Sequence, residues 1–218
     1  MSCKKYTTVL FDLDGTLTDP FEGITNSVAY SLEFYGIEVK DKSELVSFIG
    51  PPLYDSFCRY YGFSKEKAVE AVEKYREYFS VKGIYENRLY KGTEELLKQL
   101  KNKGCTLALA TSKPEVFATR ILEHFDLIKY FDVVTGSLLD GSRVKKGEVV
   151  KEALLRLGNP VKTSCIMVGD RSHDIIGAKE NDIASVGVLY GYGSEEELKN
   201  AGASFIVKNI ENIVEIIL

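Results

Sequence analysis

The chain has 218 residues, of which 44% are hydrophobic and 28% are charged, and its 28 basic and 32 acidic side chains leave a formal net charge of -4. A chain of this length buries roughly 70% of the surface that its unfolded form exposes, so it can form a core without disulfides or a structural metal. The slightly negative charge argues against a nucleic-acid partner or a polybasic membrane contact, because both require clustered positive charge.

The N-terminal residues carry no signal-peptide pattern, because the acidic motif at Asp12 comes before an apolar core can form. No stretch approaches about 18 consecutive apolar residues, the length that would indicate a membrane span. We therefore expect a cytoplasmic protein with no membrane partner, as a monomer or a small homo-oligomer. The cysteines are scattered without a C-x-x-C pair, which predicts reduced, structural thiols. They are Cys3, Cys58, Cys105 and Cys165.

Short β-rich runs alternate with helical patterns over most of the chain. Several runs are apolar throughout, which is typical of parallel strands covered on both faces. Helix starts are indicated by Pro114, which a first helical turn tolerates, and by the capping-box spacing of Ser194 and Glu197. The alternation predicts an α/β fold with a doubly wound parallel sheet of the Rossmann-like type. The predicted strands are Tyr6 to Asp12, Thr106 to Thr111, Phe131 to Thr135, Ser164 to Gly169, Ser185 to Leu189 and Phe205 to Val207.

One segment interrupts this alternation directly after the first strand. From about Phe21 to Val81 the pattern is helical only, with Ile24, Val28 and Leu32 at four-residue steps. Glycine and two prolines at 50–52 indicate a turn in the middle of this segment. We therefore predict two domains: an α/β core formed by residues 1–16 and 85–218, and an inserted all-helical cap formed by residues 17–84.

Carboxylates gather where two of the predicted strands end. Asp12 and Asp14 lie on the same side of the first strand's carboxyl end, because side chains alternate along a strand. Asp170 follows a later strand, and Asp174 comes four residues after it. Ligands bind outside the carboxyl ends of such strands, so both pairs face one crevice. Two unit charges about 4 Å apart repel by roughly 4 kcal/mol at an effective dielectric of 20, so the cluster needs a cation. Oxygen ligands favour Mg²⁺.

Groups that can hold an anion follow two other strands. Thr111 and Ser112 come after the second strand and are expected to open a helix, where hydroxyls and free amides can hold phosphoryl oxygens. Lys145 and Lys146 open the helix after the third strand, where an ammonium group can neutralise an anion. This set of residues suits phosphoryl transfer, in which positioning and electrostatics supply most of the catalysis.

The order and spacing of these motifs resemble those of the haloacid dehalogenase superfamily, in its phosphoglycolate-phosphatase-like branch. The resemblance rests on D-x-D-G-T at 12–16, on Thr111, on the lysine pair and on G-D-x-x-x-D at 169–174. It covers essentially the whole chain, including a helical cap inserted after the first motif. It implies that Asp12 is a nucleophile that forms an aspartyl-phosphate. It also implies that Asp14 acts as general acid and then as general base.

The resemblance implies roles for the remaining site residues as well. Thr111 would bind a phosphoryl oxygen, and the lysine of the third motif would hold nucleophile and phosphate together. We favour Lys146 over Lys145, because similar sequences have a lysine followed by a small residue, an acidic residue and two aliphatic residues. Mg²⁺ would be held by the side chains of Asp12 and Asp170 and by the main-chain carbonyl of Asp14. Asp174 would support it directly or through water. The turn at Gly50 would face the substrate as the cap closes.

The expected activity is therefore Mg²⁺-dependent hydrolysis of small phosphorylated substrates such as phosphoglycolate. Similar phosphosugar mutases usually have a histidine in the early cap, and residues 19–24 contain none, so the resemblance favours hydrolysis over mutase chemistry. A 5'-nucleotidase, an inorganic pyrophosphatase and a phosphosugar mutase remain alternatives, as does a phosphate-binding regulatory module without turnover. The role of His173, which lies between Asp170 and Asp174, stays open.

Overall fold

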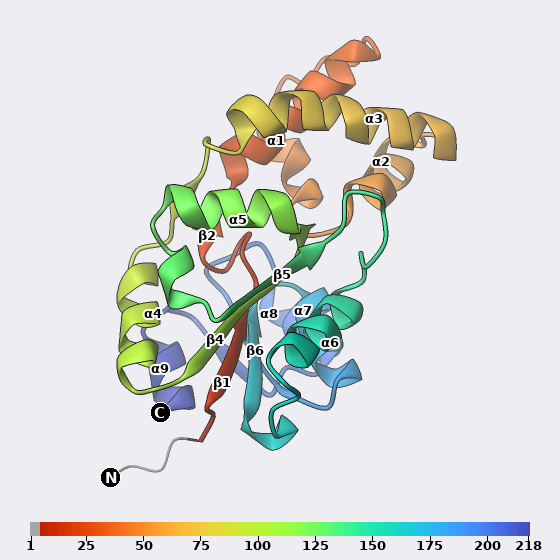
Figure 1. Ribbon diagram of the computed structural model, residues 1–218. Coiled ribbons are helices and arrows are strands. Elements are labelled where there is room, and N and C mark those ends of the chain that lie inside the picture. The colour runs from red at the N-terminus through yellow and green to blue at the C-terminus, as the bar shows by residue number, and fades with distance from the viewer. Residues whose placement is uncertain (1–4) are drawn as a thin grey trace. The chain divides into compact units, whose positions relative to one another are not determined.

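The computed structural model of the chain describes residues 5–218. In this part of the chain a six-stranded sheet has the order β5-β4-β1-β6-β7-β8, and each neighbouring pair is parallel. Figure 1 shows β5, β4, β1 and β6 side by side. The predicted α/β fold with a parallel sheet is therefore confirmed. The strands are β1 Thr8–Phe11, β4 Thr106–Pro114, β5 Val133–Ser137, β6 Cys165–Gly169, β7 Ala184–Val188 and β8 Phe205–Val207.

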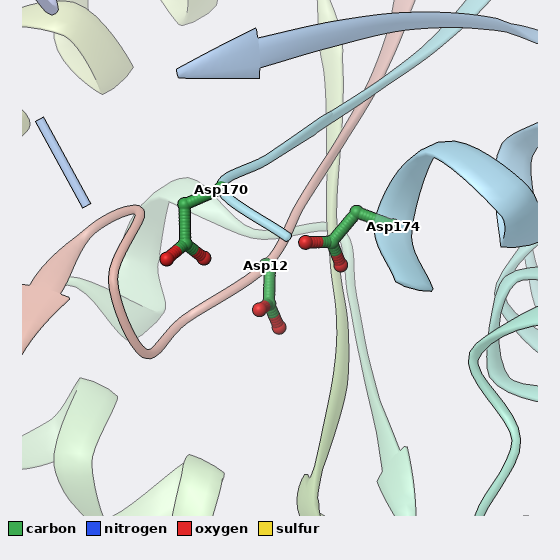
Figure 2. A group of neighbouring side chains, drawn as sticks. All are labelled: Asp12, Asp170 and Asp174. Carbon is green, nitrogen blue, oxygen red and sulfur yellow. The ribbon is translucent and has the colours of Figure 1, made fainter. Parts of the chain in front are cut away.

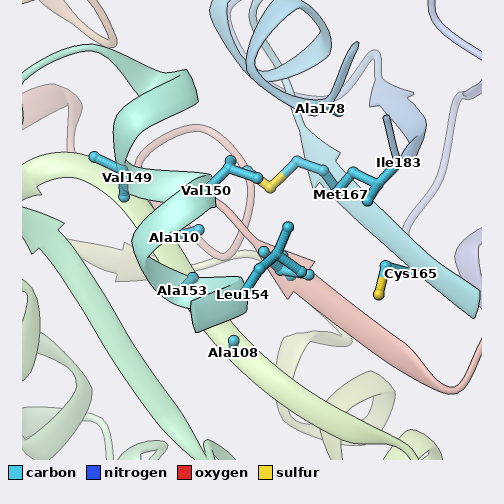
Figure 3. Close-up of a cluster of buried hydrophobic side chains, with 11 residues drawn as sticks. Ala108, Ala110, Val149, Val150, Ala153, Leu154, Cys165, Met167, Ala178 and Ile183 are labelled. Carbon is cyan, nitrogen blue, oxygen red and sulfur yellow. The ribbon is translucent and has the colours of Figure 1, made fainter. Parts of the chain in front are cut away.

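Helices cover the sheet and bury its apolar residues. On one face, α6 and α7 pack over the central strands, where Leu10, Met167 and Val150 belong to one buried cluster (Figure 3). Alternate residues of the same strands, such as Val9 and Phe11, are also buried, because they face the helices on the other side. The helices of this unit are α4 Thr93–Asn102, α5 Glu115–His124, α6 Lys146–Arg156, α7 Ser172–Glu180, α8 Glu195–Ala201 and α9 Asn212–Ile217, with short 3₁₀ turns at η3 Ile128–Tyr130 and η4 Lys162–Ser164.

The central position of β1 determines where the strand ends meet. Phe11, the last residue of β1, pairs with Leu109 on β4 and with Val168 on β6. The backbone N–H of Asp12 donates to the carbonyl of Val168 at 2.9 Å. The carboxyl ends of β1, β4 and β6 therefore lie side by side, although they are far apart in the sequence.

The chain divides into two compact units, Met1–Thr18 with Leu89–Leu218, and Asp19–Arg88. Two short paired strands, β2 Thr18–Asp19 and β3 Arg88–Leu89, mark the two positions at which the chain passes from one unit to the other. That the units are separate domains with the predicted boundaries remains a proposal.

The second unit is helical, as its sequence periodicity indicates. Ile24, Val28 and Leu32 all lie on the buried face of its first helix. Gly23 packs closely against the last residue of η2, because a Cβ on Gly23 would lie 2.0 Å from the carbonyl oxygen of Gly83. The elements are α1 Phe21–Phe34, the 3₁₀ helix η1 Lys42–Phe48, α2 Leu53–Tyr61, α3 Lys65–Tyr78 and the π-helical turn η2 Phe79–Gly83.

One predicted helix start differs from the structure. The prediction that Thr111 and Ser112 open a helix was wrong, because β4 continues through Pro114 and α5 begins at Glu115. Pro114 has an extended ψ of 130°, and a residue before proline disfavours helical geometry, so the helix cannot begin earlier.

The helix start predicted at Ser194 is confirmed, because α8 begins at Glu195. The Ser194 side chain does cap α8, but the carboxylate of Glu197 accepts hydrogen bonds from the Ser172 backbone and from Arg171 instead.

Cys58 and Cys165 are free thiols, Cys105 is buried, and Cys3 lies outside the described residues. Within residues 5–218, the helices are too short or too polar to span a lipid bilayer.

Candidate active site

The turn after β1 brings its two carboxylates toward β6. The backbone N–H of Gly15 donates to the Thr18 carbonyl at 2.8 Å, which closes the turn. Gly15 has a φ of 81°, and a Cβ at this position would lie 2.2 Å from Asp170 Oδ2. Glycine is required here for both reasons, since other residues rarely adopt this φ and none would fit beside the carboxylate.

Asp12, Asp170 and Asp174 form a buried acidic cluster. Each offers one carboxylate oxygen, and these oxygens lie within 4.8 Å of one another. Figure 2 shows the three groups converging from the end of β1, the end of β6 and the first turn of α7. Burial, followed by the charges of Asp174 and Asp12, raises the pKa of Asp170 well above its usual value. Burial also raises the pKa of Asp174, although Lys146 opposes this.

Lys146 places a buried ammonium group against this cluster. Its Nζ lies 2.7 Å from Asp12 Oδ1 and 2.8 Å from Asp174 Oδ1, and it donates to the Ala110 carbonyl at 3.1 Å. Burial alone would lower the pKa of Lys146, but the charges of the two aspartates outweigh it, so this pKa is raised. Lys146 is therefore charged at neutral pH, whereas its neighbour Lys145 is exposed to solvent.

The cluster fits a divalent cation. Lys146 neutralises one of the three carboxylates, and the two remaining negative charges equal the charge of such an ion. All three side chains supply oxygen, the donor that hard cations prefer. The buried aspartates are therefore a set of residues that can hold a metal ion.

Asp14 lies beside the cluster and is paired with Lys113, a residue that the sequence analysis missed. Lys113 Nζ lies 2.7 Å from Asp14 Oδ2, and the two side chains are only 6% and 10% exposed. Asp14 Oδ1 is buried and has no hydrogen-bond partner among the described residues. Burial raises the pKa of Asp14, and the charge of Lys113 partly opposes this. Asp14 is thus a carboxyl group with one oxygen held and the other free to exchange a proton.

A bulge in β4 explains why Lys113 reaches Asp14. Ala110 pairs with Thr135 and Pro114 pairs with Ser137, so a four-residue step on β4 faces a two-residue step on β5. A bulge of this kind bends a strand and changes the direction of its side chains. The proline after Lys113 indicates an irregular strand end, but the position of the bulge depends on pairing with β5 and cannot be read from the local sequence.

The other predicted residues lie as follows. Thr111 is buried in the bulged part of β4, and its Oγ1 accepts a hydrogen bond from the Lys113 backbone at 3.3 Å. Ser112 lies next to it, and its carbonyl accepts a hydrogen bond from Ser137. His173 is exposed in the first turn of α7. Gly50 belongs to the helical unit, and its substrate contact stays a prediction.

These features define an α/β protein with buried aspartates and a buried lysine at the carboxyl ends of its parallel strands. The sequence profile of the family described as haloacid dehalogenase-like hydrolase matches residues 9–188. The chain belongs to this family, and the resemblance seen in its motifs is confirmed.

Relatives with assigned names support the family but differ in activity. The chain is 50% identical over 195 residues to a 5'-nucleotidase of Pseudomonas aeruginosa, with 89% of this chain and 88% of the relative covered. It is 39% identical over 198 residues to the tyrosine-protein kinase PtkA of Mycobacterium tuberculosis, with 91% and 67% covered. A crystal structure of a predicted phosphatase from Clostridium acetobutylicum superposes with a TM-score of 0.93 at 52% identity, with 96% and 97% covered. These names do not agree on one substrate.

Proposed function

We propose that the protein is a Mg²⁺-dependent phosphatase that hydrolyses small phosphate monoesters through an aspartyl-phosphate. The observation that supports this most directly is the contact of Lys146 with Asp12 inside a cluster that also contains Asp170. A buried carboxylate held by a buried ammonium group beside a cation site is suited to attack a phosphoryl group, whose own negative charge must be neutralised.

In the first step, Asp12 is the nucleophile. One of its carboxylate oxygens bonds to phosphorus while the ester P–O bond breaks. Asp14 gives its proton to the departing oxygen, which leaves as an alcohol. The burial that raises the pKa of Asp14 favours the protonated form that this step needs.

In the second step, Asp14 has become a carboxylate and takes a proton from a water molecule. The oxygen of that water attacks phosphorus, the bond between phosphorus and Asp12 breaks, and inorganic phosphate is released. The nearby Lys113 favours the charged form of Asp14 that this step needs. Burial raises the pKa of Asp14 and Lys113 lowers it. These opposing effects suit a group that acts first as an acid and then as a base.

Other residues hold the substrate and the cation. Asp12, Asp170 and the main-chain carbonyl of Asp14 would hold Mg²⁺, with Asp174 as direct or water-mediated support. When bound, Mg²⁺ supplies positive charge next to the phosphoryl oxygens. Lys146, together with Thr111 and Ser112, would hold the phosphoryl oxygens in place. We assign substrate preference to the helical unit, with Gly50 as its proposed contact residue.

The test is phosphate release from an aryl phosphate in the presence of Mg²⁺. Asp12→Asn removes the nucleophile and is expected to lower kcat by at least about a thousandfold. The matched control is Asp182→Asn, which removes an exposed carboxylate whose ion-pair partner is Lys162. The control should keep its activity. Undiminished turnover in Asp12→Asn would refute the proposed nucleophile.

A nucleoside monophosphate is the second candidate substrate, because the 5'-nucleotidase relative is half identical to this chain. A panel of phosphoglycolate, nucleoside 5'-monophosphates, sugar phosphates and pyrophosphate separates the alternatives by kcat/KM. A rearranged sugar phosphate without phosphate release would indicate a mutase. A long-lived aspartyl-phosphate without turnover would indicate a regulatory module.

A further inference from the structure

The segment that follows β7, residues 190–193, contacts two acidic loops of the candidate site: the turn after β1, residues 12–18, and the loop after β6 that begins at Asp170. The hydroxyl of Tyr190 donates to the main-chain carbonyl of Thr16 at 2.9 Å. Two residues later, the backbone N–H of Tyr192 donates to Asp170 Oδ2 at 2.8 Å. One short segment is thus hydrogen-bonded to the turn after β1 and to the carboxylate after β6.

The two glycines of this segment allow it to approach closely. A Cβ at Gly191 would lie 2.2 Å from the carbonyl oxygen of Gly15 and 2.5 Å from Asp170 Cβ. A Cβ at Gly193 would lie 1.8 Å from the carbonyl oxygen of Asp170. Any other residue would force the segment and the two loops apart, because most of these neighbours are backbone atoms.

The Tyr190 side chain is held in place by its surroundings. Its ring packs edge-to-face on Tyr90, with the ring centroids 5.0 Å apart. Burial raises the pKa of Tyr190, so its hydroxyl keeps its proton and remains a donor. Thr16 also directs its own hydroxyl toward Asp170 Oδ1 at 3.4 Å. Tyr190, Thr16, Asp170 and Tyr192 therefore form a closed ring of contacts around the two loops.

We propose that residues 190–193 form a clamp that holds Asp170 and the turn after β1 at the spacing one divalent cation requires, with Tyr190 as a positioning residue. The physical reason is that the carboxylates of Asp12, Asp170 and Asp174 repel one another until a cation binds. Mg²⁺ demands a nearly ideal arrangement of oxygens, so a preset spacing raises affinity. This inference rests on the proposed function, because it assumes that the cluster binds a metal.

The test measures Mn²⁺ binding to the full chain by electron paramagnetic resonance, without substrate. Tyr190→Phe removes only the hydroxyl that holds the Thr16 carbonyl, and we expect the Mn²⁺ affinity to fall about tenfold, the lower end of the loss typical when a group that positions metal ligands is removed. The matched control is Tyr130→Phe, which removes a hydroxyl that donates to Glu94 at 2.9 Å on the surface. This control should bind Mn²⁺ as the unmodified protein does. At saturating Mn²⁺, Tyr190→Phe should recover its kcat with an unchanged KM for the aryl phosphate.

A pair of glycine variants separates positioning from general stability. Gly191→Ala pushes against the acidic loops, whereas Gly187→Ala, on β7 itself, pushes against the Leu198 side chain at 2.8 Å. Both should lower the melting temperature, but only Gly191→Ala should weaken Mn²⁺ binding. Equal weakening in both variants, or unchanged binding in Tyr190→Phe, would overturn the clamp. If the unmodified protein neither binds Mn²⁺ nor releases phosphate, the proposed function fails and the clamp fails with it.

Discussion

Lys145 and Lys146 are neighbours in the sequence but lie in opposite environments. Lys146 is buried with its ammonium group between Asp12 and Asp174, whereas Lys145 is exposed. The resemblance already favoured Lys146, because similar sequences have small, acidic and aliphatic residues after the lysine. The structure adds the physical difference between the two residues, which a pair of matched substitutions can measure.

Lys146→Met is expected to lower both activity and stability. It leaves two buried carboxylates without their ammonium partner, which costs about 3 kcal/mol of unfolding free energy in metal-free buffer. It should also lower kcat/KM for an aryl phosphate by at least about a hundredfold, since it removes a charge that holds nucleophile and phosphate. Urea unfolding and initial rates measure the two effects.

Lys145→Met is the control for this substitution. As an exposed change it should alter stability by no more than about 0.5 kcal/mol and leave the rate unchanged. Equal losses in both variants would contradict the assignment of Lys146.

The site residues differ in how far the sequence could predict them. Asp12, Asp14 and Asp170 follow apolar runs. Side chains alternate along a strand, and the carboxyl ends of parallel strands lie at one edge of the sheet, so these residues could be expected near one another. Lys113 could not be found in this way. Its contact with Asp14 depends on the register between β4 and β5, which is set by packing across the sheet and not by neighbouring residues.

At the scale of the elements, the side chain of Asp132 connects α4 with β4 and β5. It precedes β5, accepts a hydrogen bond from the Leu107 backbone on β4 at 2.8 Å, and contacts Lys101 on α4 at 2.8 Å. Burial by itself would raise the pKa of Asp132, but Lys101 and the Leu107 N–H outweigh it, so this pKa is lowered. The charged form of Asp132 therefore stabilises the fold.

Asp132→Asn is expected to lower the unfolding free energy by about 1 kcal/mol at pH 7, because the neutral amide oxygen accepts a weaker hydrogen bond from the Leu107 N–H and the partly exposed ion pair with Lys101 is lost. A folded pKa below the unfolded value near 3.9 means that the stabilisation is present above about pH 4. It is lost as the pH falls through the folded pKa. Urea midpoints at several pH values should thus differ most at neutral pH and converge in acid.

Asp182→Asn serves as the control here too, because Asp182 is 78% exposed and pairs with Lys162 on the surface. Its urea midpoint should follow that of the unmodified protein across the whole pH range. If the difference in urea midpoint between Asp132→Asn and the unmodified protein stayed constant down to acid pH, the role of the Asp132 charge would be contradicted.

The elements themselves were predictable where the hydrophobic pattern was simple. β8 was located at Phe205–Val207, as expected, because it is a short apolar run between polar segments. β4 was predicted to end at Thr111, but it extends to Pro114, since pairing with β5 resumes after the bulge. The 3₁₀ helix Lys42–Phe48 was not distinguished within the insert, because so short a helix has little periodicity.

For the whole molecule, the charge imbalance of the acidic cluster predicts that Mg²⁺ stabilises the folded state. At a Mg²⁺ concentration a hundred times its dissociation constant, the gain is about 2.7 kcal/mol. For a chain of this size that corresponds to a rise of roughly 5 to 10 °C in melting temperature. Thermal unfolding with and without Mg²⁺ measures the rise.

Asp170→Asn should abolish this rise, because it removes one of the three carboxylates. Sodium chloride at the same ionic strength controls for general screening. A Mg²⁺-dependent rise that survives in Asp170→Asn would place the ion elsewhere.

The pairing of β2 with β3 has a consequence for how this architecture can diversify. The helical insert leaves and re-enters the sheet unit at adjacent positions, Thr18–Asp19 and Arg88–Leu89. The entropy of closing a loop grows only slowly with its length, so an insert anchored in this way can be lengthened, shortened or exchanged at little cost to the sheet. An insert anchored in this way can change while the sheet unit keeps its aspartates, which is compatible with relatives that carry the names of different activities.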